Sequence, residues 1–417
     1  MPEQTQAFVD DLLIGQRRVT LADLPQPLAL HARLGLVLGP GLDGQVVHEN
    51  PNSLFETRAT ITPGGDYLLM FPDALPGVSL EVNCHYGSKD HKVNNLVAYR
   101  SHDKGRTWEG PSAPIRIDYN LHGFIPLIPR GTSRIYNFGT QPLTGKFNGI
   151  ENAVIGFRYS DDDGYTWSDV TLIEPLNDPE YMGMSVMRMC ETESGAWLLG
   201  THTGSAWVDN PEGGMTARSR CYLLRSEDQG KSWELLPGAR PAGWYLPKYE
   251  RMDEIRPIAL AGSRALAFIR TCEGHLWAMW SEDDGRTWSA PAPTPLIHSD
   301  APPMLFHLSD GKTLAAFHHN THTGSHFNDN AMIDRGQLWV SFSHDDGHTW
   351  TEPRFVLANA LATGQHGNFF DFCCSYLDMF TDGDQVHLFL PHRWRRALHL
   401  SIAEAELLRL PTKAELG

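Results

Sequence analysis

The chain has 417 residues, of which 41% are hydrophobic, and its formal net charge at pH 7 is −16. This acidic balance argues against a general nucleic-acid or anionic-membrane surface, because phosphate binding requires a basic face. No apolar run approaches the length of a membrane span, and the 38 glycines and 28 prolines suit a chain of short strands and turns.

The first residues contain neither the basic nor the apolar segment of a signal peptide, so we expect a cytoplasmic protein. Residues 1–24 are predicted to form an N-terminal extension with a helix around residues 7–14. The apolar run at residues 28–38 is the predicted strand that closes a ring with the other end of the chain. No C-x-x-C spacing is present, and we expect mostly buried thiols at Cys84, Cys190, Cys221, Cys272, Cys373 and Cys374.

An eight-residue pattern, S-x-D-x-G-x-[ST]-W, occurs five times along the chain. An apolar or aromatic stretch precedes each copy and a polar stretch follows it, which is typical of a strand, a hairpin turn and a second strand. The Asp can hydrogen-bond the backbone of its own turn, and the Gly can take a positive φ. Such a period marks a repeated structural unit. The copies begin at Ser101, Ser160, Ser226, Ser281 and Ser343.

Working outward from these octapeptides divides the chain into units of four strands. The last segment has strand-like runs around a turn near Asp382 but no octapeptide, and we predict that it is a sixth unit. The six predicted units are residues 57–115, 123–175, 183–238, 254–296, 301–357 and 375–407.

The octapeptides match the Asp box of the sialidase superfamily, and this resemblance covers nearly the whole chain. It implies an all-β fold: a six-bladed β-propeller of four-stranded antiparallel blades, five of them with Asp boxes, forming a single domain over residues 25–412. The Asp box is specific for the fold, since it also occurs in propellers that are lyases or binding proteins.

The resemblance implies a Tyr nucleophile, a Glu that activates it and an Asp acid/base. Glu254 lies in a stretch that resembles the family pattern, although an ordinary ion pair with Arg251 or Arg256 would also explain it. Asp90 precedes the first octapeptide where the family projects its acid/base. Tyr376 is the candidate nucleophile, but alignment on the following turn places Cys374 at the usual Tyr position.

The family also binds the substrate carboxylate with arginines, since a guanidinium matches a carboxylate bidentately. Arg270 and Arg335 match two of these positions. At the remaining family position this chain has Glu56, and Arg58 lies two residues further on the same strand face. Glu56 would then compete with the substrate carboxylate for Arg58. Arg393, after the second strand of the last blade, is a candidate replacement.

Histidines lie on several predicted inner strands and loops. We predict that His91, His122 and His318 bind substrate, because histidines that converge on one axis suit proton transfer or sugar hydrogen bonding. Their spacing matches no zinc signature, so we expect neither a metal nor another cofactor.

The leading hypothesis is therefore a sialidase-like exo-glycoside hydrolase that removes a terminal acidic sugar, such as a sialic or related nonulosonic acid, with retention of configuration. Its partner would be a carbohydrate that carries a carboxylate, and the oligomeric state stays open. One alternative is a polysaccharide lyase or a rhamnoside- or uronate-cleaving propeller enzyme that uses His and Tyr. Another is a glycan-binding propeller without catalysis.

Overall fold

The computed structural model describes residues 6–78, 94–115, 124–141, 152–209, 215–248, 250–320, 335–362 and 373–417. The chain divides into two compact units, one of residues 1–49, 272–275 and 295–417 and the other of residues 50–271 and 276–294. We call them unit 1 and unit 2. The expectation of one domain over residues 25–412 stays a prediction. No helix among the described residues is long and apolar enough to cross a membrane.

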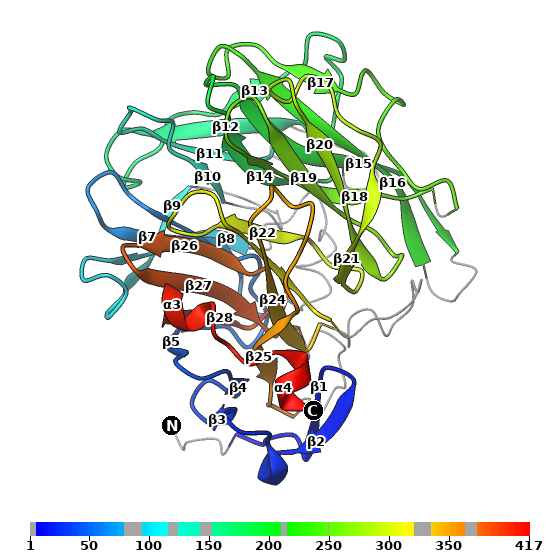
Figure 1. Cartoon of the computed structure of the whole chain (residues 1–417). Helices are drawn as coiled ribbons and strands as arrows, with labels where there is room; N and C mark the ends of the chain where they lie inside the picture. The colour runs from blue at the N-terminus through cyan, green and yellow to red at the C-terminus, as the bar shows by residue number, and fades with distance from the viewer. Residues whose placement is uncertain are drawn as a thin grey trace. The chain divides into compact units, whose positions relative to one another are not determined.

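Unit 2 carries four sheets of four antiparallel strands each, in sequence order (Figure 1). The last strand of the fourth sheet ends in residues of unit 1. The first sheet is β6 (Arg58–Ile61), β7 (Tyr67–Ala74), β8 (Asn94–Ser101) and β9 (Glu109–Ile115). The second is β10 (Ile125–Leu127), β11 (Ile135–Thr140), β12 (Ile155–Ser160) and β13 (Thr171–Ile173). The third is β14 (Ser185–Glu191), β15 (Trp197–Asp209), β16 (Met215–Ser226) and β17 (Glu234–Leu236). The fourth is β18 (Asp253–Ala259), β19 (Ala265–Arg270), β20 (His275–Ser281) and β21 (Ala292–Ile297).

Unit 1 carries the fifth and sixth blades. The fifth is β22 (Met304–His307), β23 (Leu314–His318), β24 (Gln337–Ser343) and β25 (Arg354–Asn359), extended by β4 (Leu36–Leu38) and β3 (Ala29–His31). The sixth is β26 (Asp378–Asp382), β27 (Gln385–His392), β28 (Arg396–Ala403) and β5 (Asp43–Glu49). The six sheets are the antiparallel blades of a six-bladed β-propeller, which confirms the predicted fold class.

The predicted closing strand is wrong. The strand that completes the sixth blade is β5, which pairs antiparallel with β28. The run at residues 28–38 is instead a hairpin, because the chain turns where the N–H groups of Leu34 and Gly35 donate to the carbonyl of His31. Its second strand, β4, pairs with β25 and so widens the fifth blade.

The predicted helix around residues 7–14 is also wrong. β1 (Asp11–Ile14) pairs with β2 (Arg17–Thr20) in a hairpin that turns at Gly15, whose φ is +65°. The side chain of Gln337 accepts a hydrogen bond from the Gly15 N–H at 2.8 Å and donates one to its carbonyl at 3.0 Å. Alternate residues of the hairpin, including Leu12 and Ile14, are buried beside Trp339 of the same unit. Strand periodicity buries them, and this tertiary packing decides against a helix.

All five octapeptides form the same turn between the third and fourth strands of a blade. In the first copy, Ser101 Oγ donates to Asp103 Oδ1 at 2.8 Å and accepts from the Gly105 N–H at 2.7 Å. The Thr107 N–H and hydroxyl both donate to Asp103, at 2.9 and 2.7 Å. These bonds, led by the one from the Thr107 N–H, lower the pKa of Asp103 to about 2. The octapeptide is therefore a structural device, as its pattern predicts.

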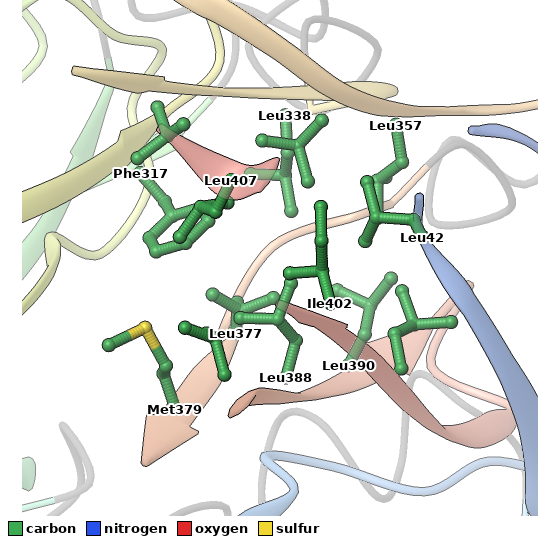
Figure 2. Packing of buried hydrophobic residues seen from close by; sticks show 14 of the residues in the cluster. Leu42, Phe317, Leu338, Leu357, Leu377, Met379, Leu388, Leu390, Ile402 and Leu407 are labelled. Atoms are coloured by element: carbon green, nitrogen blue, oxygen red, sulfur yellow. The ribbon is translucent and has the colours of Figure 1, made fainter. Parts of the chain in front are cut away.

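The main apolar core of unit 1 lies between the fifth and sixth blades. Figure 2 shows leucines and other apolar side chains from both blades meeting there, among them Phe317 and Leu338 from the fifth blade and Leu388 and Ile402 from the sixth. In unit 2, an aromatic core joins the second and third blades, where Trp233 of the third octapeptide packs edge-on against Phe138 of the second blade. The octapeptide Trp thus ties neighbouring blades together.

Candidate functional site

A buried cluster of two acids and two arginines forms at the start of β18 in unit 2. Arg270 Nη1 donates to Glu254 Oε2 at 2.6 Å, and Arg251 donates to Asp253 Oδ2 through Nε at 3.0 Å. Asp253 and Arg270 are also register partners of β18 and β19, with 3.5 Å between Arg270 Nε and Asp253 Oδ1. The four side chains are only 5–11% exposed. Each buried charge has a side chain of opposite charge beside it within the cluster, which offsets the cost of its burial. Two predicted site residues, Glu254 and Arg270, are therefore brought together.

The backbone of Glu254 has a left-handed conformation, with φ of 47°. A bulge between Asp253 and Arg256 interrupts the register of β18 with β19 at this point. The Glu254 N–H donates to His202 Nδ1 at 3.3 Å, and the same ring nitrogen lies 3.0 Å from Ser185 Oγ. His202, on β15, was missed by the sequence reasoning because it follows no motif.

The first blade places Glu56 and Arg58 in a buried ion pair. Arg58 Nη2 donates to Glu56 Oε2 at 3.0 Å, and the two side chains are 4% and 2% exposed. The spacing predicts that Glu56 competes with a substrate for Arg58, and in the structure Glu56 contacts Arg58 directly. Binding of a substrate carboxylate by Arg58 would have to share this guanidinium with Glu56.

In unit 1, two backbone hydrogen bonds anchor the segment just before Tyr376. The Cys374 N–H donates to the Arg335 carbonyl at 2.7 Å, and the Arg393 N–H donates to the Cys373 carbonyl at 2.8 Å. The Tyr376 ring lies edge-on to the Trp394 ring, with 5.8 Å between the ring centroids. The backbone of Tyr376 has a left-handed conformation, with φ of 63°. The neighbouring Cys374 belongs to the apolar core cluster of this unit, and burial raises the pKa of its thiol well above the usual value.

Arg335, the first described residue before β24, is 1% exposed. Its Nη2 donates to the backbone carbonyl of Asp300. Among the described residues, no hydrogen-bond partner faces its Nε or its Nη1. Burial of a guanidinium without an acidic partner costs free energy of folding. Binding of an anion at this side chain would offset that cost.

His318 and His319, at the end of β23, are both buried. The ring of His318 lies 3.0 Å from the Ile297 carbonyl and 3.1 Å from Ser341 Oγ, so a substrate can bind it only after one of these bonds breaks. His319 Nδ1 lies 2.8 Å from the Gln337 carbonyl. This nitrogen must carry the proton, so Nε2 accepts from Ser375 Oγ at 2.8 Å. Burial lowers the pKa of His318 to about 4 and that of His319 to about 3.

Arg393 follows β27 in a left-handed conformation with φ of 58°, and its Nη2 donates to the Ala362 carbonyl at 3.0 Å. Arg393 is 8% exposed. Three other predicted site residues, Asp90, His91 and His122, lie outside the described residues, as does Cys84. In the described part of the chain, no three His, Cys, Asp or Glu side chains gather as metal ligands.

Sequence reasoning missed three more buried polar residues of these clusters. Asp253 compensates Arg251 and Arg270, and Ser375 donates to His319. His298 stacks on His319 with 4.8 Å between ring centroids. Asp253 adjoins Glu254 and Ser375 adjoins Tyr376, so a search of the positions next to each candidate would have found two of them. No signal in the sequence indicated His298.

Six antiparallel blades, five of which carry the same octapeptide turn, define a β-propeller. The model of the BNR repeat-like domain family matches residues 140–388. This match covers more than half of the chain, and the chain belongs to that family.

Individual relatives are more distant. A xyloglucanase from a Paenibacillus species is 26% identical over 245 residues, which is 55% of this chain but only 22% of the xyloglucanase. Among solved structures, a Hadza microbial sialidase has a TM-score of 0.61 at 16% identity over 87% of this chain and 69% of that one. The NanB sialidase from Streptococcus pneumoniae has a TM-score of 0.59 at 14% identity, covering 87% and 71%. The intramolecular trans-sialidase from Ruminococcus gnavus has a TM-score of 0.56 at 13% identity, covering 90% and 99%. At such identities the structural likeness establishes the fold alone.

Proposed function

We propose that this protein is an exo-acting glycoside hydrolase that removes a terminal acidic sugar, of the sialic or related nonulosonic acid class, from a glycan. The names of its relatives, sialidases and a xyloglucanase, support glycoside hydrolysis in general. The preference for an acidic sugar rests on Arg335. This arginine is buried, and two of its N–H bearing nitrogens have no hydrogen-bond partner among the described residues.

The charges of unit 2 strengthen the case for Arg335. Arg251 and Arg270 are balanced by Asp253 and Glu254, and Arg58 is balanced by Glu56. A substrate carboxylate gains less from a guanidinium that already has an acidic partner than from one that has none. We therefore propose that Arg335 contributes most of the carboxylate recognition, with Arg393 as a further candidate, and that Arg270 and Arg58 contribute less.

Under this proposal, Tyr376 is the nucleophile, Asp90 is the acid/base and Glu254 is the activating carboxylate, as the family resemblance implies. The phenolic oxygen of Tyr376 would give its proton to Glu254 and attack the anomeric carbon, while the leaving oxygen takes a proton from Asp90. Water, giving a proton to the now ionised Asp90, would then attack the anomeric carbon and release the Tyr376 oxygen, which regains its proton from Glu254, with configuration retained overall. The backbone bonds just before Tyr376 and the contact of its ring with Trp394 suit a nucleophile, which has to be held in one geometry.

Hydrolysis of a fluorogenic sialoside tests the proposal. We expect Arg335→Ala to lower kcat/KM about 100-fold, since a charged bidentate contact contributes about 3 kcal/mol. We expect Arg335→Lys to recover only part of this loss, because an ammonium lacks the planar fork. Arg409→Ala, an exposed arginine of the same unit, is the matched control and should leave kcat/KM unchanged.

Two further substrates separate the alternatives. Release of reducing ends from neutral xyloglucan at a rate that does not depend on Arg335 would contradict an acidic substrate. The ultraviolet absorbance of an unsaturated uronate, formed from a uronate-containing polysaccharide, would instead establish a lyase. Binding of sialosides without turnover by the wild-type protein would leave only a glycan-binding function.

A further inference from the structure

A groove of about 520 Å³ runs between the second blade and the octapeptide turn of the third blade, entirely within unit 2. One wall is formed by β11, β12 and β13, and the other by residues 229–233 of the turn. The volume lies within the range of roughly 300–1,000 Å³ that is typical of small-molecule sites. It does not involve any residue of the predicted catalytic site. The side chains that matter for its chemistry are Arg134, Tyr136, Tyr159, Thr171, Leu176 and Lys231.

Comparison with the neighbouring blades shows why this groove stands out. The residue that precedes the octapeptide is Arg100 in the first blade and Arg225 in the third. Each reaches across to the following octapeptide: Arg100 Nη2 donates to the Asp163 carbonyl at 2.6 Å, and Arg225 Nε donates to the Asp284 carbonyl at 3.0 Å. These hydrogen bonds join consecutive blades.

In the second blade the residue at this position is Tyr159, so the arginine contact with the next blade is missing there. Arg134 lies over the Tyr159 ring, 3.9 Å from its centroid, and pairs with Asp161 of its own blade at 2.7 and 2.8 Å instead of reaching the third blade. Tyr136 stands beside it with 6.1 Å between the ring centroids. The groove thus has two half-buried tyrosines and lacks the interblade arginine contact of the first and third blades; the fourth and fifth blades carry Trp280 and Phe342 at the position of Tyr159.

The lining favours a neutral ligand with both apolar faces and hydroxyl groups. Arg134 is neutralised by Asp161, and the rim carries one cation, Lys231, and one anion, Glu174. Leu176, at the rim, is 76% exposed and adds apolar surface to the groove. Aromatic and aliphatic surface combined with a few donors and acceptors is the composition of a site for a small, amphiphilic ligand.

We infer that this groove binds a neutral oligosaccharide, independently of the reaction proposed above. The exposed parts of the two tyrosine rings and Leu176 would contact the apolar C–H groups of the sugars, and Thr171, Lys231 and Glu174 would hydrogen-bond their hydroxyls. Such a site would hold the glycan chain outside the catalytic centre.

Ligand-observed NMR and calorimetry with two probes, a xyloglucan heptasaccharide and lacto-N-neotetraose, test the inference. We expect saturable binding of at least one probe and an increase in its Kd of at least about tenfold in Thr171→Trp, which is about 1.4 kcal/mol. Thr171 is exposed on one wall, so a Trp there fills the groove without entering the core. Lys231→Trp obstructs the opposite wall and should have the same effect.

The matched control is Ser112→Trp. Ser112 is exposed in the equivalent groove between the first blade and the second octapeptide, so this variant should bind the probe as the wild type does. Binding should also persist in Arg335→Ala, which separates the groove from the proposed carboxylate site. The inference is overturned if neither probe binds at millimolar concentration, or if the bound probe is unaffected by both groove variants. It is also overturned if Ser112→Trp weakens binding as much as Thr171→Trp does.

Discussion

Several candidate residues, some in each unit, have backbone conformations that non-glycine residues rarely adopt. Outside the octapeptides, the described non-glycine residues with positive φ include Glu56, Glu254, Tyr376 and Arg393. Such conformations cost about 1–3 kcal/mol each and persist where the surroundings hold them. The contacts of Tyr376 and Glu254 described above provide that restraint. Glu254, Tyr376 and Arg393 were selected from the sequence by charge and motif, so backbone strain is an independent observation in favour of a functional site.

The buried histidines give this protein a defined response to acid. His318 and His319 have pKa values of about 4 and about 3, lowered by burial, whereas an unfolded His titrates near 6.5. Between these values the unfolded chain binds more protons than the folded one. We therefore expect the free energy of unfolding to be fully retained above about pH 6.5 and to fall as the pH drops toward about 4.

Urea unfolding at several pH values checks this expectation. Each of the two histidines should contribute a slope of up to about 1.4 kcal/mol per pH unit in that window, so His318→Gln should flatten the dependence. His348→Gln, at an exposed position in the last octapeptide, serves as the control and should leave the slope as it is. An unchanged slope in His318→Gln would show that this residue titrates normally.

At the scale of the element, the octapeptide turn is the most predictable part of the molecule. Its hydrogen bonds join residues no more than four positions apart, from Ser101 to Gly105 and from Asp103 to Thr107. Local contacts of this kind are encoded in the eight residues themselves, which explains why five blades were located correctly. The hairpins at the N-terminal end were not, because residues 7–14 and 28–38 are apolar enough for several structures and packing on β25 decided between them.

We expect Ser101→Ala to lower the free energy of unfolding by about 1–3 kcal/mol, because the buried Gly105 N–H loses its acceptor and Asp103 loses a donor. Thermal unfolding followed by circular dichroism measures the change. Arg106→Ala alters an exposed side chain of the same turn and should change the stability by less than about 0.5 kcal/mol. Equal effects of the two substitutions would argue against a stabilising role for the serine.

At the scale of the whole molecule, the N-terminal region completes a blade that the C-terminal region begins. β5 is the fourth strand beside β28 in the sixth blade, and Arg396 Nε donates to Glu49 Oε1 at 2.7 Å across this pair. Without β5, the ladder groups of β28 would be left unpaired at a sheet edge. The β1–β2 hairpin, by contrast, adds to the fifth blade from outside its strand ladder.

Two truncations separate these roles. Removal of residues 1–23 should leave a folded protein with a lower melting temperature, because the hairpin's apolar contacts and its bonds to Gln337 are lost. Removal of residues 1–49 should give an aggregated or unfolded chain, since β5 is lost as well. Soluble expression and circular dichroism distinguish the two outcomes. A soluble, cooperatively unfolding chain that begins at residue 50 would contradict the closing role of β5.

By itself, the sequence determined the all-β class, the number of blades, the place of each octapeptide turn and a short set of candidate residues that includes Glu254, Arg335 and Tyr376. Only the tertiary structure decided that β5 closes the sixth blade, that Glu254 pairs with Arg270 and Glu56 with Arg58, and that Arg335 is buried beside Asp300. The physical reason is the range of the interactions. Turn hydrogen bonds are local, whereas a strand's partner or a charge's partner depends on which distant segment packs against it.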